Sequence, residues 1–245
     1  MSKGIYTALS GAIASSTALD VTAENLANAS TAGFRKLRPV FREVLERETT
    51  PRLSPKHGHF TKIGSTAIDA TPGALRTTGR PLDVALPSGV FIAVSAAGGE
   101  RYTRAGSLSV SADGALTLAG SPVVGEGGEA IRAGGEGAGA GEVTVTADGE
   151  VLRGADSIGR LKLVTFDNPA GLAPNGGTLY AATPESGEAT ITSSEIAVGA
   201  LEESNASPID AMSELVKATR SFEAYERAID AFRDADRRIV TLPGA

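Results

Sequence analysis

Each end of this chain carries a helical apolar seam, and this pairing limits the folds that are open to it. Between residues 207 and 240 apolar side chains recur at heptad spacing, with one break at Asp236. In the first 29 residues, spacings of three and four place apolar side chains on one stripe of a helix. A stripe of this kind needs a partner, which is either the other terminal helix or a second copy of the chain. The pattern therefore favours assembly over catalysis.

The large side chains of these two stripes form one candidate interface, which we call the assembly seam. Its members are Ile5, Leu9, Ile13, Leu19, Leu26, Leu215, Phe222, Tyr225, Ile229, Phe232 and Ile239. Ala8, Ala12 and Ala218 lie on the same stripes. Because full burial of these side chains returns less free energy than ordering the helices costs, we predict that the termini are poorly ordered in the free monomer and fold on assembly.

Between the helices, short β-prone runs alternate with turns that contain glycine. The dipeptides Asp113-Gly114 and Asp148-Gly149 predict β-hairpins over residues 107–118 and 143–152, because glycine readily adopts a positive φ. Further strands are expected at 90–94, 160–166, 178–182 and 189–192, and the glycine run 134–141 is expected to be a surface loop. The predicted fold class is α+β, with N- and C-terminal helices forming a coiled-coil-like domain and a β-rich middle domain.

These patterns divide the chain into four expected parts. They are an N-terminal helix at 1–30, an extended connector at 31–80, a β-rich domain at 81–200, and a C-terminal helix at 201–245 that pairs with residues 1–30. The connector is rich in basic residues and interrupted by prolines, and a short helix at 39–48 is expected within it. An alternative is that the connector is an adaptable interface segment that pairs with acidic faces of neighbours.

The sequence offers little that could support catalysis. The net charge of -6 argues against nucleic-acid binding, and the absence of cysteine excludes disulfides and thiolate metal sites. Neither a phosphate-binding loop nor a dinucleotide glycine motif occurs. His57 and His59 lack a third ligand nearby, so an exposed loop pair is favoured over a metal site. Asp113 and Asp148 are favoured as turn residues over a carboxylate dyad or a calcium site.

We therefore expect no enzyme activity, no catalytic or metal-binding residues, no cofactor and no small-molecule substrate. No stretch approaches the roughly 20 apolar residues of a membrane helix, so direct membrane insertion is not expected. The first residues lack the pattern of a secretory signal, so any export is expected to proceed without a cleaved signal peptide.

Residues 25–35 resemble the N-terminal signature of the rod and hook axial proteins of the bacterial flagellum. That signature reads Asn-Leu-Ala-Asn, followed by Thr-x-Gly-Phe and a basic residue. The matching positions are Asn25, Leu26, Ala27, Asn28, Thr31, Gly33, Phe34 and Arg35. Further matching blocks lie at 82–85 leading to 90–91, and at 102–108, 112–114, 158–161, 168–172 and 201–205. The resemblance covers nearly the whole chain.

This resemblance implies a structural subunit of the flagellar basal-body rod, polymerising into the tubular drive shaft that transmits torque from motor to hook. It implies that the terminal helices form an axial inner domain and that the β-rich middle faces outward. The implied partners are copies of the chain, other rod subunits and the flagellar type III export apparatus, with the assembled rod in the periplasm.

Within the family, residues 79–84 are most similar to the proximal rod subunit, with the distal rod subunit as the alternative. A non-catalytic binding module, such as an adhesin with coiled-coil ends, is a second alternative. It would be expected to carry a secretion signal, which the sequence does not show.

Overall fold

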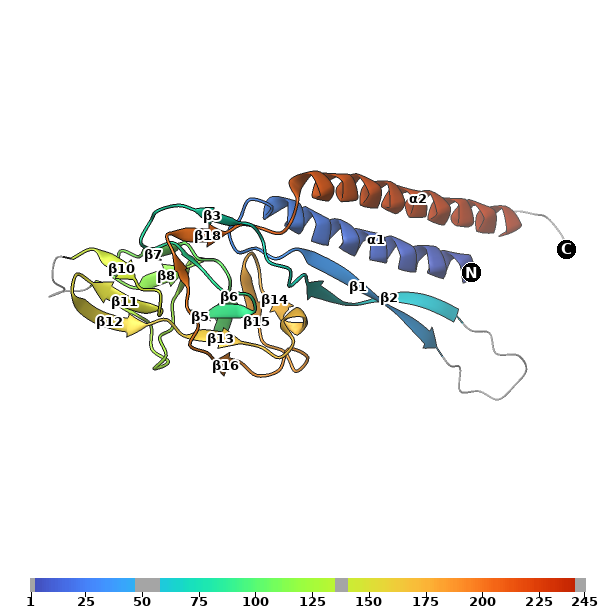
Figure 1. Ribbon diagram of the computed structural model, residues 1–245. Helices are drawn as coiled ribbons and strands as arrows, with labels where there is room; N and C mark the ends of the chain where they lie inside the picture. Colours follow the sequence, from blue (N-terminus) through green and yellow to red (C-terminus); the bar gives the residue numbers. More distant parts are fainter. Residues whose placement is uncertain (1–2, 47–57, 135–140, 241–245) are drawn as a thin grey trace. The chain divides into compact units, whose positions relative to one another are not determined.

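The computed structural model describes residues 3–46, 58–134 and 141–240, and for residues 41–46, 58–65, 236 and 238–240 it describes the backbone only (Figure 1). The chain divides into two compact units. The helical unit comprises residues 1–26, 37–66 and 208–245, and the β unit comprises residues 27–36 and 67–207. Each unit is described separately below.

Two antiparallel helices and one hairpin make up the helical unit (Figure 1). Helix α1 spans Lys3–Ala27 and helix α2 spans Pro208–Val240. Pro208 fits the first position of α2, where its missing N–H costs nothing, and Asp210 in the first turn suits the positive end of the helix dipole. The hairpin pairs β1 (Leu37–Glu46) with β2 (Gly58–Ile68).

The prediction of a short helix at 39–48 was wrong, because residues 37–46 form β1. A two-stranded hairpin contains only edge strands, and an edge strand accepts a proline such as Pro39 more readily than a central strand does. The segment 31–80, expected to be an extended connector, carries β1, β2 and β3 and is divided between the two units.

A six-stranded antiparallel sheet forms the centre of the β unit, in the order β14-β15-β6-β5-β13-β16. These strands are β5 (Val90–Ala96), β6 (Gly99–Thr103), β13 (Leu163–Thr165), β14 (Ala173–Pro174), β15 (Leu179–Ala181) and β16 (Thr190–Ile191). The register places Phe91 opposite Val164 and Ala93 opposite Tyr102. Residues 90–94 are all buried, so β5 is covered on both faces.

Smaller sheets surround this centre. Two have three strands: β7 (Leu108–Val110), β8 (Leu116–Leu118) and β9 (Ser121–Pro122), and β10 (Val143–Val145), β11 (Glu150–Arg153) and β12 (Asp156–Arg160). Two have two strands: β3 (Leu75–Thr77) with β18 (Ala200–Glu202), and β4 (Val84–Ala85) with β17 (Ala197–Val198). A short 3-10 helix spans Pro169–Gly171. Both predicted Asp-Gly hairpins are confirmed, with φ of 75° at Gly114 and 77° at Gly149.

The central sheet separates two kinds of core. Successive residues of a strand point to opposite faces. Ile92 and its alternate neighbours join an aliphatic cluster with the smaller sheets, including Val84, Leu108, Leu116, Leu118, Val151 and Leu161. Phe91 instead joins an aromatic cluster: its ring lies 5.7 Å from that of Phe166 and 6.2 Å from that of Tyr180, and Tyr102 lies 4.8 Å from Phe166.

The α+β fold class is confirmed. Neither helix, over the ranges that the structure describes, has a stretch apolar enough to cross a membrane.

Candidate assembly site

Asn25, the first residue of the signature, fastens the end of α1 to the start of β1. Its side chain is 1% exposed. The Nδ2 group donates to the carbonyl oxygen of Leu37 over 2.9 Å, and the Oδ1 atom accepts from the Leu37 N–H over 2.7 Å. A side-chain amide is well suited to bond both backbone groups of one residue. Asn25 therefore has an internal structural role in the helical unit.

Gly33 and Phe34 are fixed inside the β unit. Gly33 has a φ of 73°, and its N–H donates to the Glu202 carbonyl oxygen over 2.8 Å. A Cβ atom at this position would lie 2.3 Å from the backbone of Arg104 and Ala105. Glycine is therefore required both by the left-handed backbone and by the close approach of another segment. The next residue in the sequence, Phe34, is fully buried.

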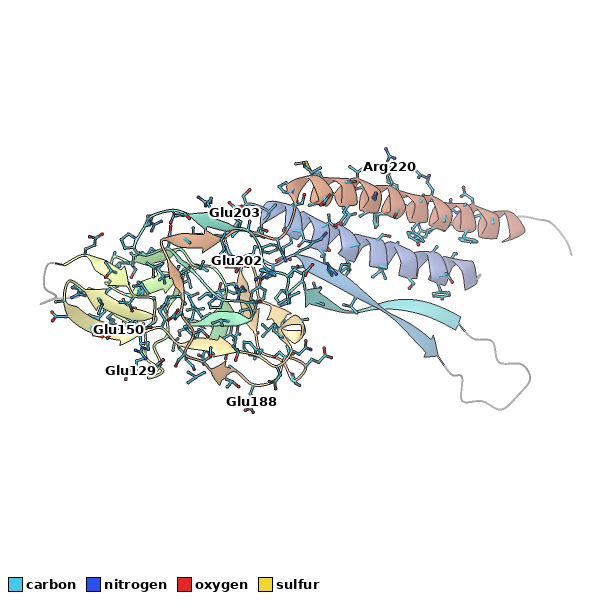
Figure 2. All side chains as sticks on the ribbon, in the orientation of Figure 1. Glu129, Glu150, Glu188, Glu202, Glu203 and Arg220 are labelled. Atoms are coloured by element: carbon cyan, nitrogen blue, oxygen red, sulfur yellow. The ribbon has the colours of Figure 1, made fainter. Side chains whose placement is uncertain are left out.

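The basic residue of the signature, Arg35, belongs to a buried group of three charges. The Nη2 atom of Arg35 lies 2.6 Å from Oε1 of Glu202, and Nη2 of Arg104 lies 2.6 Å from Oε2 of the same carboxylate. None of the three side chains is more than 3% exposed. The next residue, Glu203, has a side chain that is 49% exposed, so the two neighbouring glutamates point to opposite environments (Figure 2).

Backbone carbonyl groups accept further hydrogen bonds from both arginines. Arg104 donates to the carbonyl oxygens of Leu86, Pro87 and Val90, and its guanidinium lies 5.6 Å from the centre of the Phe91 ring. Arg35 donates to the carbonyl oxygen of Thr71. Two cations share one carboxylate, so these carbonyl dipoles help to stabilise the excess positive charge.

The environment of Arg35 also affects its acidity. Burial lowers the pKa of the Arg35 guanidinium, and the positive charge of Arg104 lowers it further, while Glu202 opposes both effects. An arginine side chain nevertheless keeps its proton in proteins. Arg35 is therefore a buried permanent charge, and its stability inside the β unit depends on Glu202.

Asn205 and Tyr180 complete the arrangement. The Asn205 Oδ1 atom accepts from the Lys36 N–H over 2.6 Å, and its Nδ2 group donates to the carbonyl oxygens of Asp69 and Thr71 over 3.1 and 2.9 Å. The Tyr180 hydroxyl accepts from the Arg35 N–H over 3.2 Å.

We call the following set the clasp: Gly33, Phe34, Arg35, Arg104, Tyr180, Glu202 and Asn205. In sequence, its first three members follow α1 and its last two precede α2. The clasp thus joins the segments next to both terminal helices within the β unit. The remaining signature residues Leu26, Ala27, Asn28 and Thr31 lie at the end of α1 and in the following turn, where the Thr31 hydroxyl donates to the Asn28 side-chain oxygen over 3.3 Å.

In the helical unit, α1 contacts α2 through its small residues. A Cβ atom added at Gly4 would lie 2.6 Å from the Phe232 ring, and one added at Gly11 would lie 2.3 Å from the Tyr225 ring. The aromatic side chains of α2 therefore rest directly on the glycines of α1. Ala8 and Ala12 on the same helix are each only 7% exposed.

The structure divides the assembly seam between two environments. Leu9, Ile13 and Tyr225 are exposed, by 46%, 56% and 38% respectively. The half-buried members are Ile5, Leu19, Leu26, Leu215, Phe222, Ile229 and Phe232. The side chain of Ile239 lies outside the described residues. The large side chains Leu9 and Ile13 thus lie on a more exposed face of α1 than Ala8 and Ala12 do.

Sequence reasoning did not assign roles to Arg104, Tyr180 and Glu202. Arg104 and Glu202 lie in blocks that match the rod and hook family, but the matches alone do not show that they form an ion pair. One sequence signal could have indicated that these charges are buried, because each lies next to apolar residues in a β-prone run. Tyr102 and Ala105 lie close to Arg104, and Leu201 precedes Glu202.

No cluster of three or more potential metal ligands occurs among the described residues. His57 lies outside those residues, as does the side chain of His59. A hollow of about 350 Å³ in the β unit is lined by Thr, Ala, Ser, Gly and Leu, so its lining has no group that titrates near neutral pH.

Comparisons with known proteins connect these features to a family. Residues 5–35 match a family model described as flagella basal body rod protein, and residues 197–242 match the C-terminal model of flagellar basal body rod FlgEFG proteins. The chain is 33% identical over 247 residues to the flagellar basal-body rod protein FlgF of Caulobacter vibrioides, covering 100% of this chain and 99% of the relative. The chain belongs to the flagellar basal-body rod protein family.

Other relatives give the same result. FlgF of Salmonella typhimurium is 34% identical over 252 residues, covering 97% of each chain. The rod protein FlgG of Bacillus subtilis is 27% identical over 268 residues, covering 99% of each. The chain is thus a structural subunit of the bacterial flagellar basal-body rod, and it is more similar to these FlgF proteins than to this FlgG. The two family matches include both halves of the clasp that flank the helices, namely Gly33–Arg35 and Glu202–Asn205.

Proposed function

We propose that the α1–α2 pair is the polymerising element of this proximal rod subunit, and that the β unit is a preformed body that assembly leaves intact. The distribution of exposed apolar side chains carries this proposal. Among the described residues, seven of the eleven exposed large apolar side chains lie on the two helices: Tyr6, Leu9, Ile13, Ile209, Met212, Val216 and Tyr225. Exposed apolar side chains that gather on one element indicate a surface that a partner covers.

The clasp supports the second half of the proposal. All its ion pairs and hydrogen bonds lie within the β unit, and its charged side chains are buried. The buried, hydrogen-bonded part of the signature, Gly33–Arg35, cannot also be the surface on which neighbouring subunits dock. Recognition between subunits is therefore assigned to the helices, and Gly33–Arg35 is assigned to folding of the single chain.

In this proposal, residues 1–30 and the C-terminal helix within 201–245 form the axial part of the rod. Residues 81–200 form the outer body, and 31–80 link the two parts. The subunit passes through the flagellar export apparatus and assembles in the periplasm with copies of itself and with other rod subunits. It has no catalytic role and binds no nucleic acid.

The substitution Ile229→Asp tests the role of the helix pair. Because Ile229 belongs to the assembly seam, a carboxylate there should prevent incorporation into basal bodies while the β unit keeps its melting temperature. Ile191→Asp is a matched control, because Ile191 lies on β16 of the β unit and is 54% exposed. The Ile191→Asp variant should be incorporated into basal bodies normally. Normal basal bodies and motility with Ile229→Asp would contradict the proposal.

Deletion of the gene distinguishes the two rod positions. Electron microscopy of purified basal bodies should show rings without a completed rod. A block at the first rod segments supports the proximal assignment, whereas an arrest after a short rod supports the distal alternative. Complete rods and hooks would rule out both.

A further inference from the structure

Two apolar strips on the helical unit have the same spacing. On α1 the strip consists of Tyr6, Leu9 and Ile13, which are 49%, 46% and 56% exposed. On α2 the strip consists of Ile209, Met212 and Val216, which are 80%, 55% and 52% exposed. In both strips the residues are separated by three and then four positions, so each forms a ridge of about two helical turns. We call them the α1 strip and the α2 strip.

The α1 strip lies on a helix surface that has no charge. From Gly4 to Leu19 the chain has no charged residue, although α1 is a helix throughout this range. A surface helix normally carries charged residues opposite its apolar stripe, and a helix face without them is typical of a covered surface. The contact with α2 lies on the face with Gly4 and Gly11. The exposed apolar side chains of the α1 strip therefore offer a surface that a second copy can cover.

The two strips lie at opposite ends of the helix pair. Gly4 is level with Phe232 and Gly11 with Tyr225, so seven residues forward on α1 correspond to seven residues backward on α2. On this register the α1 strip is level with about residue 227 of α2, whereas the centre of the α2 strip is at about residue 213. The difference of about 14 residues corresponds to roughly 21 Å along the axis.

We propose that the α1 strip of one copy packs on the α2 strip of a second copy, displaced by about 21 Å along the axis of the helix pair. Copies that point in the same direction keep α1 of one antiparallel to α2 of the next. The displacement then places Tyr6 beside Val216, Leu9 beside Met212 and Ile13 beside Ile209. Both strips of every copy are used, and the contact does not close on itself, as a rod requires. This inference rests on the proposed function.

The size of the contact favours a polymer over a free dimer. Six side chains that are about half exposed offer on the order of 100 Å² each, or roughly 600 Å² in total. Stable pairwise complexes bury about 1,200–2,000 Å². One such contact is too small to hold two copies together in solution. It becomes effective when each copy is also held by other neighbours in the rod.

Cysteine cross-linking tests the register, because the chain contains no cysteine. The test uses the double variant Ile13→Cys/Ile209→Cys, with Leu9→Cys/Met212→Cys as a second pair. The control Ile13→Cys/Val216→Cys uses the same exposed strips but separates the sulfurs by about 10 Å along the axis, beyond the reach of a disulfide. Basal bodies are purified from strains that express each variant and are then mildly oxidised.

We expect disulfide-linked dimers and higher oligomers with both matched pairs, and monomers with the control and with each single variant. The inference is overturned if the matched variants are present in basal bodies but remain monomeric, or if the control cross-links equally well. Absence of the wild-type chain from basal bodies would instead overturn the proposed function, so the two failures are distinguishable.

Discussion

Replacing Glu202 with glutamine should lower the stability of the β unit far more than its small change in shape suggests. Glutamine keeps the length of the side chain and one acceptor for the Gly73 N–H, which donates to Oε1 over 2.9 Å. It removes the one negative charge that, among the described residues, pairs with the buried side chains of Arg35 and Arg104. Both guanidinium groups then remain buried without a counter-charge.

The expected magnitude follows from the cost of such charges. Removing one partner of a buried ion pair costs about 3–5 kcal/mol. For a unit of about 150 residues, 1 kcal/mol changes the melting temperature by roughly 2–4 °C, so the β-unit transition should fall by about 6–20 °C. Differential scanning calorimetry of the full-length chain measures this shift.

Glu203→Gln is the matched control. Glu203 pairs with Arg76 over 3.0 Å, but the two side chains are 49% and 58% exposed, so this pair contributes little. The melting temperature of the Glu203→Gln variant should stay within about 2 °C of that of the wild-type protein. Adding Arg35→Gln to Glu202→Gln should recover part of the lost stability, since one of the two uncompensated cations is then absent. The reasoning is refuted if Glu202→Gln and Glu203→Gln melt at the same temperature.

Further substitutions and one exchange measurement test the remaining contacts. Gly33→Ala should destabilise the β unit in urea unfolding by clearly more than Gly79→Ala, since both have a φ of 73° but a Cβ atom meets backbone only at Gly33; equal losses would contradict the close approach. Asn25→Leu should cost the assembled helical unit about 1–3 kcal/mol by leaving the backbone groups of Leu37 unpaired; purified basal bodies titrated with urea should release the variant chain at a lower concentration than the wild-type chain, and equal release would count against this. Phe34→Ala should cost the β unit about 3–5 kcal/mol, also read from its unfolding transition. Amide hydrogen exchange should be fast across residues 215–239 in the free chain. Strong protection of these amides in a confirmed monomer would show that α2 is already folded before assembly.

Periodicity and turn chemistry predicted the main elements of the fold. The heptad spacing around Phe222 and Ile229 led to α2, and the glycines at 114 and 149 led to two hairpins whose positive φ they supply. These signals are local, because a helix face and a tight turn each depend on residues close in sequence. Strand β1 was missed because Pro39 and its charged residues resemble those of a solvated connector.

The clasp could not be derived from the sequence in this way. Arg104 and Glu202 are 98 residues apart. Arginine and glutamate usually lie on the surface, so neither residue type alone indicates a buried ion pair. Only the pairing of β18 with β3 and the course of the chain after Thr103 bring them together. The seam was identified as apolar, but spacing alone could not show that Gly4 and Gly11 would face α2 while Leu9 and Ile13 faced outward.

The clasp also has a consequence for the timing of folding. Lys36 and Asn205 are 169 residues apart, so the bond between them closes almost the whole β unit. Contacts of such long range form late, because the entropy of the intervening loop must be lost first. If the chain is exported as proposed and its N-terminus leads, Arg35 cannot pair with Glu202 until more than four-fifths of the chain has passed. Until then Arg35 would lack its counter-charge, and the β unit would remain open. Export and folding would thereby be separated in time by the position of one glutamate near the trailing end.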